Sequence, residues 1–481
     1  MIFNSLTYFV LLLTIIPLFW ILPYRARLLL ILTSSLMFYG FWKIEFLPVM
    51  LASVVVDFLV SRKMPESNQV VKKRLLMTSL FVNLGMLFYF KYLIFFAENA
   101  IGLADIFGFT IDPIALTIIL PLGISFYTFQ TISYTVDCYR GIISPEKDFI
   151  LYASYVTFFP QLVAGPVLRA KEVIPQFKVR VPFSWVFIAE GARRIIFGLF
   201  LKVVIADNIA PLVETGFAIP LETIGAIDVW TLAFLFGFQI YFDFSAYSHI
   251  ALGSAKLMGV SFPENFNFPY SSSSPKEFWR RWHISLSSWI RDYLYLPLSG
   301  ATFKDRSVGG LEGAASPTEK KWPLFVSWSI MGLWHGANWT FVLWGVYHAF
   351  VIFLYRQVSP ITVNLPKFIR VYGGLAVTLP IMMLAWIPFR AESLDATFSM
   401  WATVINPHAY QSLGMRENSY LVAFVLLVGF FIAFWINQNI SIKRWHSNKT
   451  LLASEVFLFT ILIPLIVIFL RPINQFIYFQ F

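Results

Sequence analysis

Residues 6–22 have the sequence LTYFVLLLTIIPLFWIL, an apolar run without a charged side chain. An α-helix rises about 1.5 Å per residue, so about 20 mostly apolar residues are enough to cross the hydrocarbon core of a bilayer. No basic segment precedes this run and no small-residue cleavage site follows it. We therefore expect Leu6–Leu22 to be a retained transmembrane helix and not a cleaved signal peptide.

Similar apolar runs recur along the whole chain, with no soluble domain between them. Backbone polar groups must be satisfied inside a bilayer, so such runs form helices. We count about eleven of them: Leu6–Leu22, Leu28–Trp42, Phe46–Val60, Leu75–Phe96, Leu116–Val136, Ile195–Val213, Val229–Leu252, Pro323–Tyr355, Val371–Phe389, Tyr420–Trp435 and Val456–Leu470. The sequence predicts an all-α polytopic membrane protein with one integral-membrane domain over residues 1–481.

The composition excludes a water-soluble fold. Apolar residues make up 58% of the chain and charged residues 13%, against roughly 45–50% and about 25% in soluble domains. The 52 Phe, 21 Tyr and 16 Trp residues also exclude a disordered chain. Cys138 is the single cysteine, and no Cys/His pair has the spacing of metal ligands, so we expect neither a disulfide nor a bound metal.

Basic residues exceed acidic ones by 36 − 26 = 10. Such an excess is typical of cytoplasmic loops in membrane proteins, so we expect no nucleic-acid partner. The loop at 62–74 is strongly basic, whereas the stretch 98–112 carries acidic residues alone. This alternation predicts that 62–74 faces the cytoplasm and that both termini lie outside.

Two segments do not fit simple membrane crossing. Leu151–Gly165 is apolar but lies between two basic loops, and we expect it to be re-entrant. The stretch Lys256–Lys321 is too apolar for a solvated loop and too charged to span, so we expect interfacial helices there. Within it, Asp305–Pro317 is rich in Gly, Ala and Ser, which predicts a flexible tip.

His283 lies in FWRRWHISLSSWIRDYL, residues 278–294. At helical spacing its tryptophans could form one stripe, with Arg280 and Arg281 displaced from it. Two interpretations stay open. The segment is either an interfacial helix with aromatic and basic anchors, or a cationic rim that receives a phosphate-bearing substrate.

His335 lies in GLWHGANW, residues 332–339, between apolar runs. A helix that begins near Trp322 would carry His335 roughly 20 Å inward, close to the bilayer midplane. A helix break at Gly336–Asn338 would let the chain return to the cytoplasmic side. A neutral buried imidazole there suits a general base, and the alternative is a structural histidine bonded to a neighbour such as Asn338.

Six blocks in order give the chain a resemblance to the membrane-bound O-acyltransferase family, in particular to its bacterial branch that includes the alginate O-acetyltransferase membrane subunit. The blocks are PLGISFYTFQ (121–130), FPQLVAGP (159–166), YFDFS (241–245), residues 278–294 with Pro297-Leu298, residues 334–339, and FIYFQF (476–481). The resemblance covers nearly the whole chain. It implies a central tunnel and a catalytic core at about 116–356.

The resemblance also implies roles for single residues. His335 matches the presumed catalytic base and His283 the second essential histidine. Arg280, Arg281 and Lys276 would hold the phosphates of the donor. The polar residues expected to line the tunnel are Gln161, Asp243 and Asn338. Relatives often have an acidic residue where His249 stands, so no role is carried over to that position.

The implied reaction is O-acetyl transfer across a bacterial cytoplasmic (inner) membrane. Acetyl-CoA would be a donor substrate, with no bound cofactor, and the acceptor would be an exopolysaccharide such as alginate, or peptidoglycan. The expected partners are membrane lipids and a periplasmic or extracellular esterase-like acetyltransferase. The alternatives are D-alanyl transfer to teichoic acid from a carrier protein, a transporter or flippase of a lipid-linked glycan, and a structural scaffold. No internal repeat typical of transporters is present, and Gly-x-Ser-x-Gly is absent.

Overall fold

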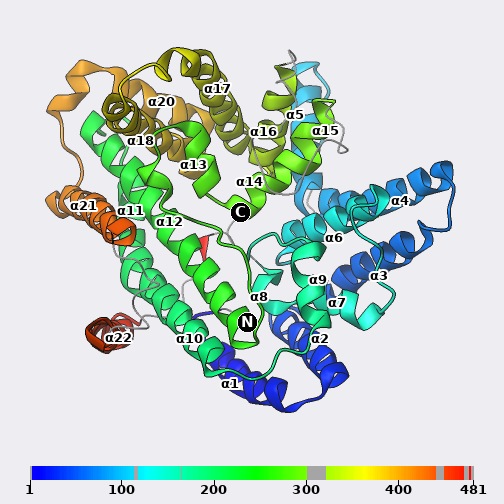
Figure 1. The fold of residues 1–481 in the computed structure, drawn as a ribbon. Coiled ribbons are helices and arrows are strands. Elements are labelled where there is room, and N and C mark those ends of the chain that lie inside the picture. Colours follow the sequence, from blue (N-terminus) through cyan, green and yellow to red (C-terminus); the bar gives the residue numbers. More distant parts are fainter. Residues whose placement is uncertain are drawn as a thin grey trace. The chain divides into compact units, whose positions relative to one another are not determined.

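The structure is a computed structural model that describes residues 3–112, 117–163, 165–300, 321–439, 449–470 and 476–477. Throughout these ranges every regular element is a helix (Figure 1), which confirms the all-α class. The predicted flexible tip at 305–317 lies outside the described residues.

Among the described residues, seven helical stretches are long and apolar enough to cross a membrane. They are Ile44–Lys63, Gln69–Ile106, Trp185–Phe217, Ala226–Leu257, Trp339–Thr362, Ile369–Arg390 and Glu417–Asn439. Two shorter apolar helices are Leu6–Ile21 and Glu455–Ile468. The protein is therefore a multi-pass membrane protein, while the larger number of eleven crossings and the central tunnel stay predictions.

The described residues divide into two compact units. The first unit runs to Ile195 and also includes Ile250–Pro263. Its elements are α1 (Leu6–Ile21), α2 (Tyr24–Gly40), η1 (Ile44–Phe46), α3 (Leu47–Lys63), α4 (Gln69–Leu87), η2 (Phe88–Tyr92), α5 (Leu93–Ile106), α6 (Ile124–Tyr139), α7 (Phe149–Thr157), α8 (Phe159–Leu162), α9 (Ala170–Lys178) and most of α10 (Trp185–Leu199).

The second unit contains Ile196–His249, Glu264–Ser299 and the described residues beyond 320. Its elements are η3 (Phe200–Ala206), α11 (Asp207–Phe217), most of α12 (Ala226–Leu257), η4 (Pro269–Ser271), α13 (Pro275–Arg281), α14 (Ile284–Ile290), η5 (Arg291–Tyr295), α15 (Leu296–Leu298), α16 (Trp322–His335), α17 (Trp339–Thr362), η8 (Ile369–Gly373), α18 (Gly374–Leu384), α19 (Trp386–Arg390), α20 (Leu394–Ile405), η9 (Pro407–Gln411), α21 (Glu417–Asn439) and α22 (Lys449–Ile468).

A buried polar network joins α3, α4 and α6 in the first unit. The Asp57 carboxylate is fully buried and accepts hydrogen bonds from the Ser79 hydroxyl, the Asn83 amide at 2.8 Å and the Thr135 hydroxyl at 3.1 Å. Apolar packing alone gives membrane helices little reason to prefer each other over lipid. These hydrogen bonds therefore specify which helices pack together.

The expected re-entrant segment forms two short buried helices. The nine residues of α7 span about 14 Å, too little to cross a bilayer, and α8 follows with four. Gly123 is the N-cap of α6 with φ = 71°, and an added Cβ there would lie 2.6 Å from the Leu162 carbonyl oxygen. The blocks at 121–130 and 159–166 are thus in direct contact.

The predicted helix break at 336–338 is confirmed. The helix α16 begins at Trp322 and ends at His335, and α17 begins at Trp339. The two helices approach closely through glycines: an added Cβ at Gly332 would lie 2.1 Å from the Phe341 carbonyl oxygen, and one at Gly345 would lie 2.1 Å from that of Trp328. Any larger side chain at either glycine would force α16 and α17 apart.

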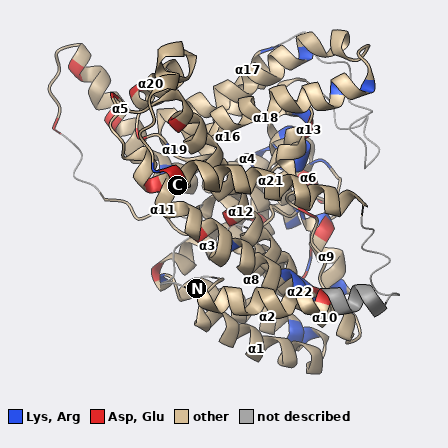
Figure 2. Ribbon diagram, turned by 90° about the vertical axis from the view of Figure 1, so that its left-hand side faces the viewer, with Lys and Arg blue, Asp and Glu red and all other residues tan. Residues whose placement is uncertain are grey.

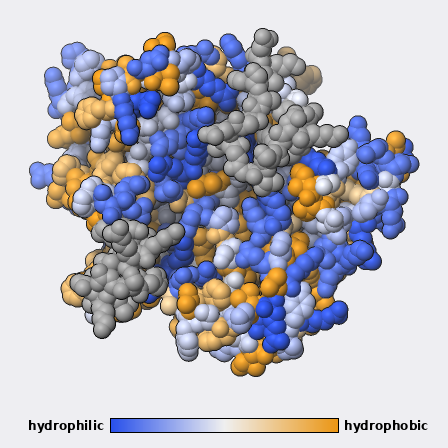
Figure 3. Space-filling view, in the orientation of Figure 1, coloured by the Kyte–Doolittle hydropathy of each residue, from blue (hydrophilic) through white to orange (hydrophobic). Residues whose placement is uncertain are grey.

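The surface carries the apolar side chains that a lipid environment requires. Charged residues occupy little of the ribbon in Figure 2, and Figure 3 shows orange apolar side chains among polar ones. Phe81 is 80% exposed and Trp185 is 75% exposed, although both are large and apolar. In water such exposure would favour aggregation, whereas lipid acyl chains cover it at no cost.

Membrane topology can be tested on the helical stretch Gln69–Ile106. Its 38 residues correspond to about 57 Å, more than a bilayer's thickness, so we expect its two ends on opposite sides of the membrane. Lys73 is exposed near the beginning and Asp105 near the end. We expect an impermeant thiol reagent to label Asp105→Cys in intact cells, and to label Lys73→Cys only after permeabilisation. The reverse pattern would contradict the assigned orientation, and the buried native Cys138 gives the background.

Candidate active site

His335 is the last residue of α16 and is 5% exposed. Its ring packs among the rings of Trp334, Trp344 and Phe389, with centroid distances of 4.9, 5.0 and 5.1 Å. A Cβ added at the next residue, Gly336, would lie 2.1 Å from the Phe341 ring. Glycine at this position lets the chain leave the helix directly after the histidine, inside an aromatic pocket.

His283 lies between α13 and α14 with φ = 41° and ψ = 54°, a left-handed conformation that is rare for residues other than glycine. The residues on either side are held by backbone hydrogen bonds: Ile284 donates to the Asn265 carbonyl, and Asn267 donates to the Arg281 carbonyl, each at 2.9 Å. Residues 278–294 therefore do not form one helix. The tryptophan stripe considered from the sequence is divided at His283, and its three tryptophans are all buried.

Asn265 orients the His283 ring. Its Oδ1 lies 3.2 Å from His283 Nδ1 and also accepts hydrogen bonds from the backbone amide and the hydroxyl of Ser285. An amide oxygen can only accept, so Nδ1 carries the hydrogen and Nε2 keeps its lone pair. Complete burial lowers the pKa of His283 from 6.5 to about 3, so the ring is neutral at pH 7.

The rings of both predicted catalytic histidines pack against the indole of Trp334. The Trp334 ring centroid is 4.9 Å from that of His335 and 6.4 Å from that of His283. Residues 52 positions apart in the sequence are thus brought together inside the second unit. Within the described ranges, no three His, Cys, Asp or Glu side chains converge as metal ligands would.

The three predicted phosphate-binding residues differ in their surroundings on α13, which carries basic residues in Figure 2. Lys276 and Arg280 are exposed and four residues apart, so they lie on one helix face. Arg281 is paired with Glu277, Nη2 to Oε1 at 2.9 Å, and donates to the Asn267 carbonyl. Lys276 and Arg280 are therefore the two charges of this set that face outward.

The ion pair with Arg281 also changes the pKa of the Glu277 carboxyl group. Burial alone would raise its pKa, but hydrogen bonds from Ser273 and the charge of Arg281 outweigh burial and lower the pKa below its ordinary value. Glu277 is therefore ionised at neutral pH and holds the Arg281 side chain against the 265–267 segment.

Asp243 belongs to a buried ion-pair network. Its Oδ1 lies 2.7 Å from Lys202 Nζ, which also lies 2.8 Å from Asp207, and its Oδ2 accepts the backbone N–H of Ile477 at 2.7 Å. The Lys202 ammonium also lies 4.6 Å from the centre of the Phe476 ring. These contacts anchor the described part of the FIYFQF block to the second unit.

The other two residues predicted to line a tunnel have local partners. Gln161 is buried in α8 of the first unit and donates from Nε2 to the Tyr155 carbonyl. Asn338 is exposed and caps α17, because its Oδ1 accepts the Thr340 amide at 3.0 Å. A place for either residue in a tunnel stays a prediction.

His348 on α17 was given no role by the sequence, which shows it only as one polar residue in an apolar helix. It is fully buried, and its ring packs against Trp344 at 4.7 Å and Trp279 at 4.9 Å. The i, i+4 spacing from Trp344 was the available signal, because it places His348 on the helix face that also meets His335.

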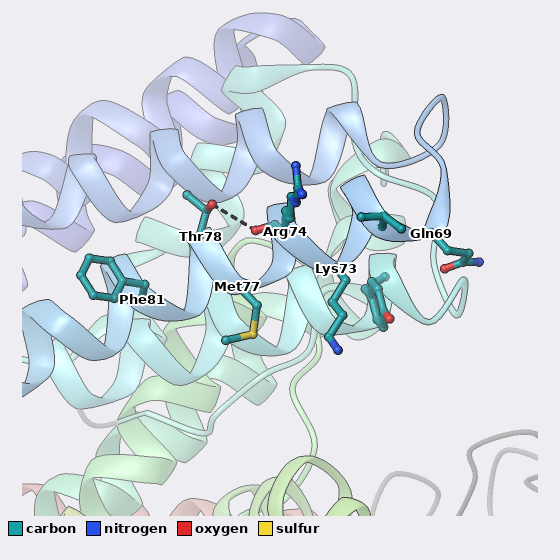
Figure 4. Close-up of a pocket in the computed structure, with 8 residues that line it drawn as sticks. Gln69, Lys73, Arg74, Met77, Thr78 and Phe81 are labelled. Carbon is teal, nitrogen blue, oxygen red and sulfur yellow. Dashed lines mark hydrogen bonds between the residues drawn. The ribbon is translucent and has the colours of Figure 1, made fainter.

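A separate groove of about 800 Å³ lies on the first unit and includes none of the predicted site residues. Figure 4 shows Lys73, Met77 and Phe81 along one side of α4, where the spacing of four places them on one face. The groove therefore combines a positive charge with exposed apolar side chains, as expected of a lipid-facing surface near a headgroup region.

Comparison with known proteins gives a consistent result. Residues 144–387 match the family described as MBOAT, membrane-bound O-acyltransferase. The probable alginate O-acetylase AlgI of Azotobacter vinelandii is 38% identical, over 84% of this chain and 78% of the relative. The peptidoglycan O-acetyltransferase of Helicobacter pylori is 34% identical, over 79% and 73%. The teichoic acid D-alanyltransferase of Bacillus subtilis is 28% identical over about half of each chain, 49% and 58%.

The Lys202 network should dominate the stability of its surroundings. Lys202→Met removes the ammonium that lies 2.8 Å from Asp207 and 2.7 Å from Asp243, and breaking a buried pair costs about 3–5 kcal/mol. We expect a clear fall in the midpoint of thermal unfolding in detergent. The double variant Lys202→Met/Asp243→Asn also removes one of the two carboxylates that Lys202 pairs with, and should recover part of the loss. Equal midpoints for wild type and Lys202→Met would contradict the role of the network.

Proposed function

This chain belongs to the membrane-bound O-acyltransferase family, and we propose that it transfers an acetyl group from acetyl-CoA on the cytoplasmic side to a hydroxyl acceptor outside. The observation that carries the proposal is the pair of buried histidines in contact with Trp334. The alginate and peptidoglycan O-acetylation relatives match more of the chain, at higher identity, than the D-alanyltransferase does. This difference favours acetyl transfer over the D-alanyl alternative.

In the proposed reaction His335 is the general base. Its imidazole takes the proton of the acceptor hydroxyl as the hydroxyl oxygen attacks the thioester carbonyl. The carbon–sulfur bond then breaks, the acetyl group stays on the acceptor oxygen, and the proton passes to the leaving thiolate. The aromatic rings around His335 exclude water, which would otherwise compete as the acceptor.

His283 acts as the second catalytic histidine in this proposal. With Nδ1 held by Asn265, its Nε2 is a hydrogen-bond acceptor of fixed orientation. Such an atom can receive the O–H of the acceptor and turn its oxygen toward the thioester. The strained backbone of His283 is consistent with this role, because strain of this kind persists where the surroundings enforce a required geometry.

The relatives indicate the chemical class of the acceptor but not the particular molecule. We propose a cell-envelope polysaccharide, either an exopolysaccharide such as alginate or peptidoglycan, reached through a separate periplasmic or extracellular esterase-like protein. The corresponding location is the bacterial inner membrane. A transporter or flippase would have no need of two buried histidines beside an exposed basic helix face.

Substitution of His335 tests the proposed base. We expect His335→Ala and His335→Gln both to lose acetyl transfer by about 10²- to 10⁴-fold, because a glutamine cannot take up a proton. The assay is transfer from labelled acetyl-CoA in membranes that contain the partner proteins, with expression level and thermal stability measured alongside. Substantial turnover by His335→Gln at normal protein level would return His335 to a structural role.

The exposed charges of α13 test the donor site. We expect Lys276→Gln/Arg280→Gln to raise the KM for acetyl-CoA about ten- to a hundredfold, since charge-assisted hydrogen bonds to phosphate are lost. Arg281→Gln should have a smaller effect, because its guanidinium is already paired with Glu277. Lys171→Gln, which removes an exposed charge on α9, controls for net charge. An unchanged KM in the double variant would contradict a role in donor binding and would favour membrane anchoring by Lys276 and Arg280.

A further inference from the structure

His348 lies at the centre of a cluster of tryptophans drawn from three helices. Its ring centroid is 4.7 Å from Trp344 on α17, 4.9 Å from Trp279 on α13 and 5.6 Å from Trp328 on α16. Trp344 in turn is 5.0 Å from His335. The same indole thus contacts both the proposed base and His348, so His348 is separated from the proposed base by a single ring.

Several polar atoms of this cluster are buried without a hydrogen-bond partner in the part of the chain that the structure describes. They are Nδ1 and Nε2 of His348 and the indole Nε1 atoms of Trp279 and Trp344. His348 is 0% exposed, Trp344 1% and Trp279 8%. Native proteins satisfy almost all of their buried polar atoms, so four such atoms in contacting rings are available to a polar ligand.

The chemistry of these atoms limits the ligand. An indole only donates, whereas a neutral imidazole donates from one nitrogen and accepts at the other. A complementary ligand therefore has carbonyl oxygens and at least one N–H or O–H group. A free phosphate has acceptor oxygens in excess and would be better matched by the exposed charges of Lys276 and Arg280 on α13. A chain of amide groups supplies both a carbonyl and an N–H at each link.

We propose that His348, with Trp279 and Trp344, binds the amide-bearing arm of the acyl thioester donor close to its thioester end. This inference rests on the proposed function, because that function supplies the donor. The arm runs between the phosphates and the reactive carbonyl, and α13 contributes both Trp279 to the cluster and the outward charges of Lys276 and Arg280. His348 is a donor-binding residue that leaves the proton transfer to His335.

Two substitutions separate hydrogen bonding from packing. His348→Phe keeps an aromatic ring of similar size and removes both nitrogens, whereas His348→Gln keeps one donor and one acceptor and removes the ring. We expect His348→Phe to weaken binding of coenzyme A to the purified protein about five- to tenfold, the loss of about one hydrogen bond. His348→Gln should bind more tightly than His348→Phe. Tyr347→Phe, which loses a hydroxyl bonded to the Ile381 carbonyl, is the matched control on the same helix and should bind normally.

A shortened donor distinguishes the contribution of the amide arm to binding from that of the phosphates. With S-acetylpantetheine, which has the amide arm but lacks the nucleotide, the effect of His348→Phe on KM should persist and that of Lys276→Gln/Arg280→Gln should disappear. Equal binding of coenzyme A by wild type and His348→Phe would overturn the proposal. A His348→Phe protein that fails to fold while His348→Gln folds would also overturn it, since the nitrogens would then serve the fold.

The outcomes also distinguish this inference from the proposed function. If wild type binds coenzyme A but transfers no acetyl group, the proposed function fails. The binding role of His348 is then decided by how tightly the His348 variants bind coenzyme A. If wild type transfers acetyl groups and His348→Phe has a normal donor KM, only the inference about His348 fails. If wild type binds no coenzyme A, both fail.

Discussion

The fold depends on the absence of water from the bilayer core. Because lipid offers no hydrogen bonds, each polar group at that depth must be satisfied by the protein itself. The described helices show how this is done. Asp57 is surrounded by donors from two other helices, and Asp243 is neutralised by Lys202. These contacts choose among helix pairings that apolar surfaces alone would leave nearly equivalent.

The same constraint explains why the proposed catalytic residues occur where helices end. A continuous helix uses its own backbone polar groups and leaves only side chains to act. At His335 the helix stops against Phe341, and at His283 the chain adopts a left-handed conformation fixed by Asn265. Each break places an imidazole where its orientation is set by neighbours in space and not by helical periodicity. Glycine makes the first break possible, and a hydrogen-bonded asparagine stabilises the second.

Hydropathy was enough to predict the class of fold, because the length of an apolar run is a local property. The break at 336–338 was also predictable, since the mostly apolar run of 33 residues at 323–355, with basic residues beyond it, cannot form one straight crossing. The break at His283 was not predictable. It depends on hydrogen bonds with Asn265, 18 residues away, and the local pattern of tryptophans favours one helix instead. The ion pair between Arg281 and Glu277 could be predicted from their i, i+4 spacing. The spacing did not show that this pair turns Arg281 away from the outward-facing charges of α13.

His348 shows most clearly what a sequence leaves out. Along the chain it resembles any single histidine in an apolar helix, for which a satisfied structural role is the usual outcome. Its distinguishing property is that tryptophans from three helices surround it and offer no acceptor to its ring, which only tertiary structure can show. A ring packed solely for its shape would be served as well by phenylalanine, without the cost of desolvating two nitrogens. The imidazole at this position lies beside indoles whose own N–H groups have no partner among the described residues, and the donor-binding role proposed for His348 accounts for both facts.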